Sequence, residues 1–167
     1  MFSRQSIQED LKQSMLKKNE LRTGTLRMLL AAVSNKEKEK RYKMSKAEPN
    51  LSEQELQAKS ELSLQEVQDA VSSEVKKRRE AAEGFEKGGR KEQAEKERQE
   101  MEILLPYLPT QLSEDEIRQL VKDVIAKVRA AGPQDFGKVM GVLAPQTRGK
   151  ADGNLVSKIV KELLTLQ

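Results

Sequence analysis

The sequence predicts an all-α protein with an N-terminal domain of long helices and a small C-terminal bundle of three helices. Three observations lead to this prediction. Apolar residues recur at helical spacing along most of the 167 residues, no segment alternates like a strand, and Ser-x-x-Glu capping boxes precede several of the apolar repeats. Apolar residues make up 36% of the chain and charged residues 35%, which suits helices with narrow buried stripes and broad solvated faces.

The first two helices are predicted over residues 3–18 and from Glu20 onward. In the first, Ile7 and Leu11 are followed at helical spacing by Met15 and Leu16, and Asn19 breaks the helix. The second carries a wide apolar arc of Leu21, Thr25, Leu26, Met28, Leu29, Leu30, Ala32 and Val33.

The end of the second helix is fully charged over residues 36–41. A solvated helical tail explains this run better than a nucleic-acid patch, because acids alternate with the bases. Residues 44–51, with a Pro-Asn pair, are predicted to form a loop.

Two capping boxes follow, at Ser52–Glu55 and Ser63–Glu66. They predict either a short helix before a long one or a single helix from Ser52, and the sequence does not choose between these. The long helix ends at the paired glycines 88–89, and a further helix is predicted over residues 90–105. The buried positions of the long helix are predicted to include Val67, Ala70, Val71, Val75, Ala82 and Phe85.

Two prolines within residues 106–109 indicate a domain boundary. The predicted domains are therefore residues 1–105 and 110–167, joined by a stiff proline-rich segment. Tyr107 and Leu108 are expected to pack against a neighbour instead of lying in a flexible linker.

The C-terminal domain shows the clearest helical signals. A capping box at Ser113–Glu116 begins a helix that Gly132-Pro133 ends, Asp135 caps a short helix that Pro145 ends, and Asp152 caps a last helix. The last helix is predicted to bury Leu155, Ile159, Leu163 and Leu166.

The composition excludes several kinds of chemistry. The chain has no His and no Cys, which removes serine–histidine triads, thiolate nucleophiles and zinc–thiolate sites. Carboxylate pairs such as Glu53/Glu55 and Glu114/Glu116 lie at helix starts, where capping explains them. We therefore predict no catalytic residue, no metal site and no cofactor. With no apolar run of membrane-spanning length, the protein is expected to be cytoplasmic without a membrane partner.

A glycine-rich stretch near the C-terminus is the candidate site. Gly149-Lys150 lacks the earlier glycine, the Ser/Thr and the preceding strand of a phosphate-binding P-loop. Gly137 and Gly141 lie one helical turn apart, and each costs the helix about 1 kcal/mol relative to Ala. Either close packing between helices or the approach of another molecule's backbone would account for them.

Basic residues surround this stretch. Arg148 and Lys150 directly precede a helix N-terminus, where free amide groups attract anions, although Asp152 partly cancels that field. Lys138 and Lys158 are expected nearby. These four residues and the two helix glycines form a predicted phosphate-contacting patch.

Five segments together resemble the YqeY-like (GatB/YqeY) family over nearly the whole chain. They are residues 26–32 (LRMLLAA), 74–90 (EVKKRRE with Phe85 and Gly89-Arg90), 107–113 (YLPTQLS), 137–141 (GKVMG) and 149–153 (GKADG). Residues 51–63 depart from the usual family length.

The resemblance implies an all-helical protein whose C-terminal domain is similar to the tail of the B subunit of the tRNA-dependent amidotransferase. In that enzyme the tail contacts tRNA, and the chemistry lies on other domains. The family's label of carbon–nitrogen ligase with glutamine as amido-N-donor finds no catalytic residues here. The resemblance therefore predicts a non-catalytic module that binds tRNA or an aminoacyl-tRNA complex, and the alternative is a protein–protein adaptor.

Overall fold

The structure, a computed structural model, describes residues 4–165 and confirms the all-α prediction, with no strand in that range. The predicted helix start at Ser3 and the predicted apolar position Leu166 lie outside the described residues. The helices are α1 (Arg4–Leu16), α2 (Glu20–Ala47), α3 (Glu53–Ser60), α4 (Leu64–Lys87), α5 (Lys91–Leu104), α6 (Glu114–Val128), α7 (Phe136–Thr147) and α8 (Gly153–Thr165), with short 3-10 turns η1 (Leu105–Tyr107) and η2 (Pro133–Asp135).

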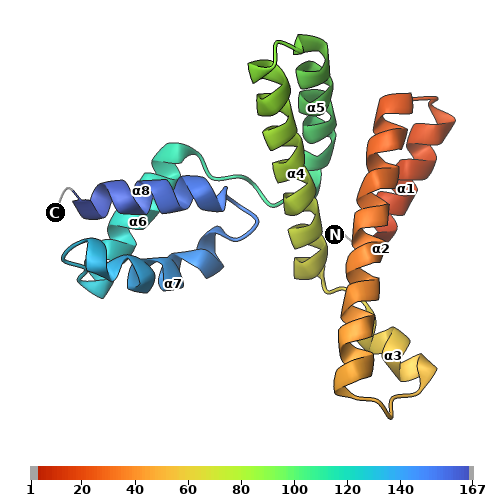
Figure 1. Cartoon of the computed structure of the whole chain (residues 1–167), viewed down its shortest axis with the longest axis horizontal. Helices are drawn as coiled ribbons and strands as arrows, with labels where there is room; N and C mark the ends of the chain where they lie inside the picture. Colours follow the sequence, from red (N-terminus) through yellow and green to blue (C-terminus); the bar gives the residue numbers. More distant parts are fainter. Residues whose placement is uncertain (1–3, 166–167) are drawn as a thin grey trace. The chain divides into compact units, whose positions relative to one another are not determined.

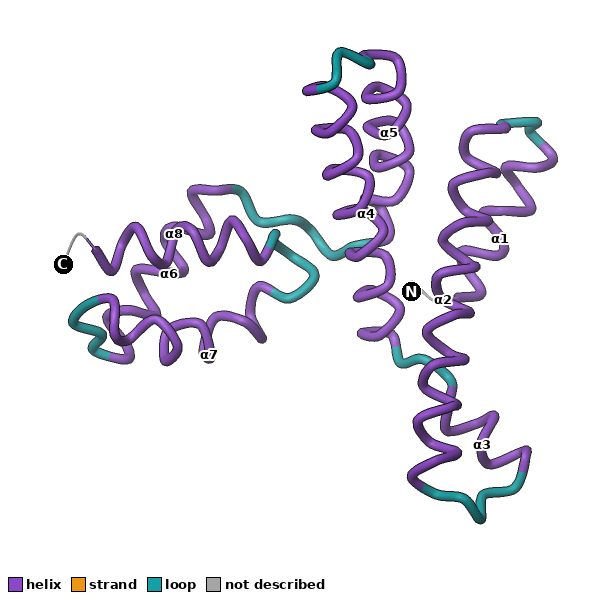
Figure 2. The backbone as a smooth tube through the Cα atoms, in the orientation of Figure 1, coloured by secondary structure: helices purple, strands orange, loops and turns teal. Residues whose placement is uncertain are grey.

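The chain divides into two compact units, Met1–Tyr107 and Leu108–Gln167. In the first unit, α1 runs antiparallel to α2, and α4 runs antiparallel to α5 (Figure 1). Only short loops join the paired helices (Figure 2). α2 contacts both α4 and α5, so it connects the two pairs. The buried apolar side chains of this unit are Ile7, Leu26, Leu29, Val33, Val67, Ala70, Val71, Val75, Ala82, Ala94, Leu104 and Tyr107.

The buried stripe of the first two helices is narrower than the sequence predicts. Met15, Leu16 and Met28 are exposed by 50, 77 and 56%, respectively. α1 packs chiefly against α2, so this pair can cover only one stripe on each helix. The prediction that these three side chains face the core is therefore wrong.

The structure also decides the uncertain region after α2. The helix continues into the predicted loop as far as Ala47, and the Glu48 N–H bonds the Met44 carbonyl at 2.8 Å. Two helices follow, since Ser52 and Ser63 each cap a separate helix with a complete capping box. The alternative of a single helix from Ser52 is thereby excluded.

A buried ion network joins α4 to α5. Arg78 is only 4% exposed, and its guanidinium donates to carboxylate oxygens of Glu74 at 2.9 Å and of Glu100 at 3.2 Å. Burial acts to raise the pKa of Glu74, but hydrogen bonds from Lys77 and Arg78 outweigh it and hold that pKa below its ordinary value. The guanidinium also lies 3.7 Å from the sulfur of Met28 on α2. Three helices therefore meet at this arginine.

Tyr107 ties the end of the first unit to its beginning, and its predicted packing is confirmed because the side chain is buried. Its hydroxyl donates to Asp10 of α1 and accepts from Arg22 of α2 at 3.4 Å. Burial and the bond to Asp10 raise the pKa of Tyr107, so the hydroxyl keeps the proton that it donates.

In the second unit, α6, α7 and α8 enclose one core, and α7 runs antiparallel to α8 (Figure 1). Leu155 and Leu163, predicted to be buried, are only partly buried, so the inward face of α8 is centred one residue further along. The fully buried members of the core are Ile117, Val121, Val124, Ile125, Ala130, Val139, Leu143, Val156, Ile159, Val160 and Leu164.

Two predicted helix boundaries in this unit are wrong. α6 ends at Val128, before Gly132-Pro133, because Arg129 adopts a left-handed conformation (φ 51°) that stops the helix. α7 continues through Pro145 to Thr147. The missing N–H of Pro145 leaves the Gly141 carbonyl without the bond that residue 145 would otherwise donate.

Asp135 occupies the N-cap position of α7, but its side chain makes no capping bond among the described residues. Its carboxylate instead accepts a hydrogen bond from the Ala131 N–H at 2.8 Å. The predicted cap is therefore wrong, and the carboxylate stabilises the preceding turn. Within residues 4–165, no helix is long and apolar enough to cross a membrane.

Replacing Arg78 should destabilise the first unit strongly. We expect Arg78→Met to lower the free energy of unfolding by about 3 kcal/mol, because Glu74 and Glu100 then lose their shared cationic partner. Urea unfolding followed by circular dichroism measures this loss. The control is Lys76→Met on the same helix, where a half-exposed lysine pairs weakly with Glu80 and the cost should stay below about 0.5 kcal/mol. Equal losses in the two variants would contradict a buried network.

The stability of the α4 start should depend on pH. Hydrogen bonds from Lys40 and from the Ser63 N–H lower the pKa of Glu66 from 4.5 to about 2. The stabilisation is therefore complete above the unfolded pKa and is lost as the pH falls toward 2. Thermal melts should show Glu66→Gln less stable than the unaltered chain near neutral pH, with the difference shrinking in acid. Glu83→Gln, at an exposed position of α4, should show no such trend, and a pH-independent difference for Glu66→Gln would overturn the assignment.

Candidate nucleic-acid interface

The two glycines of α7 lie on an exposed face of the helix. A Cβ added at Gly137 or at Gly141 would meet no atom within 4 Å among the described residues. Close packing between helices of this part of the chain therefore does not explain them. The face they form is bare backbone, and it includes the Gly141 carbonyl that Pro145 leaves without its helical donor.

Lys138 begins beside this face but turns toward the end of α6. Its Nζ donates at 2.7 Å to the carbonyl of Val128, which is the last residue of α6. A cation at a helix C-terminus also interacts favourably with the helix dipole. Lys138 therefore has a structural contact besides any role with a ligand, and its side chain remains solvent-exposed.

Arg148 and Lys150 lie together in the turn between α7 and α8, about 15 Å along the α7 axis from Lys138. Gly149 between them has φ +72°, a left-handed conformation that favours glycine. The Arg148 N–H donates to the Ala144 carbonyl at 3.1 Å, so the helical hydrogen-bond pattern of α7 extends to the first residue of the turn.

The segment before α6 holds this turn in place. The Gln111 side-chain amide donates to the Gly149 carbonyl at 2.8 Å, and the Leu112 N–H donates to the Lys150 carbonyl at 2.7 Å. A Cβ on Gly149 would lie 3.8 Å from the Pro109 ring. Two motifs that are 38 residues apart in the sequence therefore form one structural unit. Sequence reasoning did not identify Gln111, although it lies in a segment that carried the family resemblance.

The start of α8 is already occupied by an acid. Asp152 accepts from the N–H groups of Asn154 at 2.8 Å and Leu155 at 3.4 Å, which confirms the predicted cap. These amides are therefore not open to an external anion. Any attraction of this turn for phosphate rests on the side chains of Arg148 and Lys150.

Lys158 lies on the second turn of α8, next to a surface ion network. Arg118 of α6 donates to Glu162 at 3.0 Å and to Glu114 at 2.9 Å. The hydrogen bond from Arg118 lowers the pKa of Glu162, and the nearby charge of Lys158 contributes in the same direction. Arg148 and Lys150 thus share the turn between α7 and α8, while Lys138 lies near the start of α7 and Lys158 lies on α8.

Comparison with known proteins gives a family and three relatives. Residues 46–164 match the family described as Yqey-like protein. All three relatives are named altered inheritance of mitochondria protein 41, mitochondrial. The relative from Eremothecium gossypii is 32% identical over 102 residues, which cover 61% of this chain and 46% of that protein. Those from Pyrenophora tritici-repentis and Lachancea thermotolerans are each 27% identical, over 95% and 96% of this chain and 78% and 80% of their own lengths.

The names of these relatives contradict the expected cytoplasmic location, since each is designated mitochondrial. The expectation rested on the absence of an apolar run of membrane-spanning length, and this feature does not distinguish the two compartments. The family match covers more than two thirds of the sequence, including the whole of α4 to α7 and most of α8. The chain belongs to the YqeY-like family.

Proposed function

We propose that the C-terminal unit is a non-catalytic module that binds RNA, with tRNA or an aminoacyl-tRNA complex as the ligand. The observation that carries the proposal is the exposed glycine face of α7, where nothing within the described residues requires the absence of side chains. A face of bare backbone permits a sugar–phosphate chain to approach closely. The resemblance of this unit to the amidotransferase tail favours tRNA among RNAs.

The charges around the glycine face support a backbone contact. Arg148 and Lys150 lie at the C-terminal end of α7 and Lys138 lies at its N-terminal end, so cations flank the face on both sides. RNA phosphates bind such side chains, and the contacts position the nucleic acid without reading its sequence. Lys158, close to Glu162, contributes less because an acid partly offsets its charge.

The α7 backbone offers a further contact of a kind that suits RNA. The Gly141 carbonyl lacks the donor that residue 145 would supply, and a ribose 2′-hydroxyl can donate to such an oxygen. In this proposal the carboxylates of the unit have structural roles. Glu116 closes a capping box with Ser113, and Glu114 and Glu162 pair with Arg118.

Charge reversal in the turn tests the proposed site. We expect Arg148→Glu with Lys150→Glu to weaken binding of a tRNA by tenfold or more at low salt, and the unaltered chain to lose affinity steeply as salt rises. Gel-shift titration at two salt concentrations measures both effects. The control is Lys122→Glu with Lys127→Glu on exposed positions of α6, which makes the same change in net charge. Undetectable tRNA binding at low salt would overturn the proposal.

Substitution of the glycines separates folding from binding. Gly141→Ala should raise the free energy of unfolding of the second unit by about 0.5–1 kcal/mol, because alanine favours the helix and its methyl meets no neighbour. The same change should weaken tRNA binding if bare backbone is needed there. Thermal melts and the gel-shift titration read the two effects independently. A variant that is more stable and binds tRNA unchanged would remove the glycine face from the proposed interface.

The adaptor alternative predicts a different outcome from the same chain. An affinity pull-down with and without nuclease distinguishes the two functions, since partners bridged by RNA are lost on nuclease treatment. Protein partners that survive nuclease, together with no tRNA binding, would favour the adaptor.

A further inference from the structure

Positive charge is concentrated on one segment of α2. Residues 36–46 contain six Lys or Arg and two Glu, a net charge of +4, and the whole chain of 31 basic and 27 acidic residues also has a net charge of +4. The rest of the sequence is therefore balanced. The density of positive charge along this segment can attract an anionic partner.

One of the two acids of this segment, Glu37, forms an ion pair with α1. The Glu37 carboxylate accepts from the Arg4 guanidinium of α1 at 2.8 Å. On the same side of α2, Arg41 is bound by Glu53 of α3. Glu37, one of the two alternating acids that argued for a solvated tail, thus lies on another face of the helix.

Four lysines of the segment remain without an acidic partner among the described residues, namely Lys36, Lys38, Lys43 and Lys46. At 3.6 residues per turn they fall within an arc of about 160°. Tyr42 lies inside this arc and is 60% exposed, with the Lys46 Nζ 4.6 Å from the centre of its ring. We call Lys36, Lys38, Tyr42, Lys43 and Lys46 the α2 basic face. Glu39 is the one acid of residues 36–46 within the same arc.

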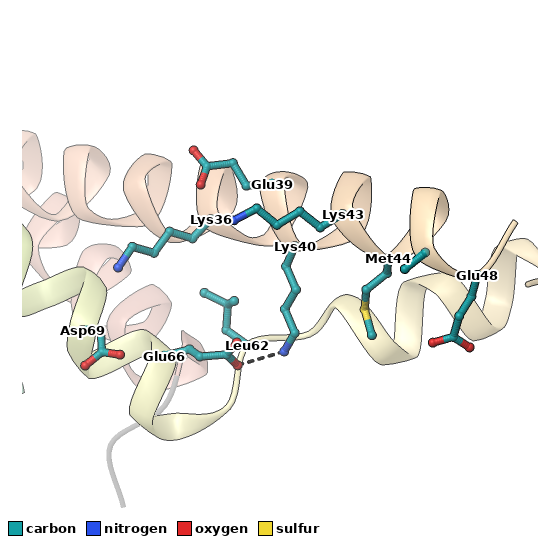
Figure 3. A pocket seen from close by; sticks show the side chains of 10 residues that line it. Lys36, Glu39, Lys40, Lys43, Met44, Glu48, Leu62, Glu66 and Asp69 are labelled. Atoms are coloured by element: carbon teal, nitrogen blue, oxygen red, sulfur yellow. Dashed lines mark hydrogen bonds and ion pairs between the residues drawn. The ribbon is translucent and has the colours of Figure 1, made fainter. Parts of the chain in front are cut away.

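One edge of the α2 basic face borders a groove of about 510 Å³ between α2 and the start of α4 (Figure 3). Lys36 and Lys43 line it, and Lys40 reaches across to Glu66 at 2.8 Å. Glu48, another acid of the lining, is bound by Lys59 at 2.6 Å. These two acids are therefore paired with lysines, while Glu39 and Asp69 are the other acids of the lining.

We infer that the α2 basic face binds a single-stranded segment of RNA, with the lysines contacting phosphates and Tyr42 stacking on a base. An exposed aromatic ring among unpaired cations is the combination that binds single strands, because every base offers a face for stacking. The inference takes RNA as the partner from the proposed function, but it assigns the contact to the other unit. A membrane surface fits less well, since a helix that binds lipid needs a broad apolar face and this one carries a single aromatic ring.

Fluorescence anisotropy with a labelled single-stranded RNA of roughly 16 nucleotides tests the inference. Lys38→Glu with Lys46→Glu should weaken binding by about tenfold or more and should reduce the slope of log affinity against log salt by about 1.4, from two lost phosphate contacts. Tyr42→Ala should weaken binding by about fivefold or more, whereas Tyr42→Phe should preserve it. Glu39→Gln should strengthen binding, because it removes the acid from the face.

The matched control is Lys91→Glu with Lys96→Glu on exposed positions of α5, which changes the net charge equally. If this control weakens binding as much as the α2 pair does, the effect is general charge and the inference is overturned. Preference for a duplex of the same sequence, or binding to phosphatidylserine vesicles that the RNA does not displace, would overturn it as well. Thermal melts of each variant verify that the exposed substitutions leave the fold intact.

The failure of this inference differs from the failure of the proposed function. Binding that responds to Arg148→Glu with Lys150→Glu but not to the α2 variants would refute the α2 face alone. Binding that responds only to the α2 variants would support the inference and remove the C-terminal turn from the interface. A chain that binds neither tRNA nor the single strand would overturn both.

Discussion

The N-terminal unit depends on the buried guanidinium of Arg78. A charge removed from water is tolerated only where partners satisfy it, and Glu74 and Glu100 supply these partners from α4 and α5. Helices with such narrow apolar stripes have little hydrophobic surface to fix their alignment. Glu74 pairs with Arg78 within α4, and Glu100 adds a second partner from α5, so the network favours the alignment of α5 that brings Glu100 to Arg78. Because the guanidinium also touches Met28, the same arginine helps to position α2 and its basic face.

In the C-terminal unit, hydrogen bonds to backbone carbonyls fix the turn between α7 and α8. Gln111 and Leu112 bind the carbonyls of Gly149 and Lys150, so the segment before α6 shapes the turn after α7. The exposed basic side chains of that turn therefore project from a fixed backbone. Beside them, α7 retains glycines that lower its stability without any packing benefit within the described chain.

The sequence predicts what is local and misses what distant residues decide. All three Ser-x-x-Glu boxes, at Ser52, Ser63 and Ser113, form as predicted because both partners lie within one helical turn. The burial of Arg78 could not be predicted, since its neighbours in sequence are charged and its partner Glu100 is 22 residues away. The same reason explains the site. Lys138 was grouped with Arg148 by proximity in sequence, but only the fold shows that it contacts Val128, and only the fold shows Glu37 turned toward Arg4.

The contact of Tyr107 with Asp10 has a consequence for how the protein is made. The two residues are 97 positions apart, so α1 cannot acquire this partner until almost the whole first unit has left the ribosome. Closing so long a loop is entropically costly, and the contact therefore forms late, after the local α1–α2 and α4–α5 hairpins. We expect the two helical hairpins to form before this contact joins them. The contact can therefore form only once the proline-rich segment has emerged from the ribosome.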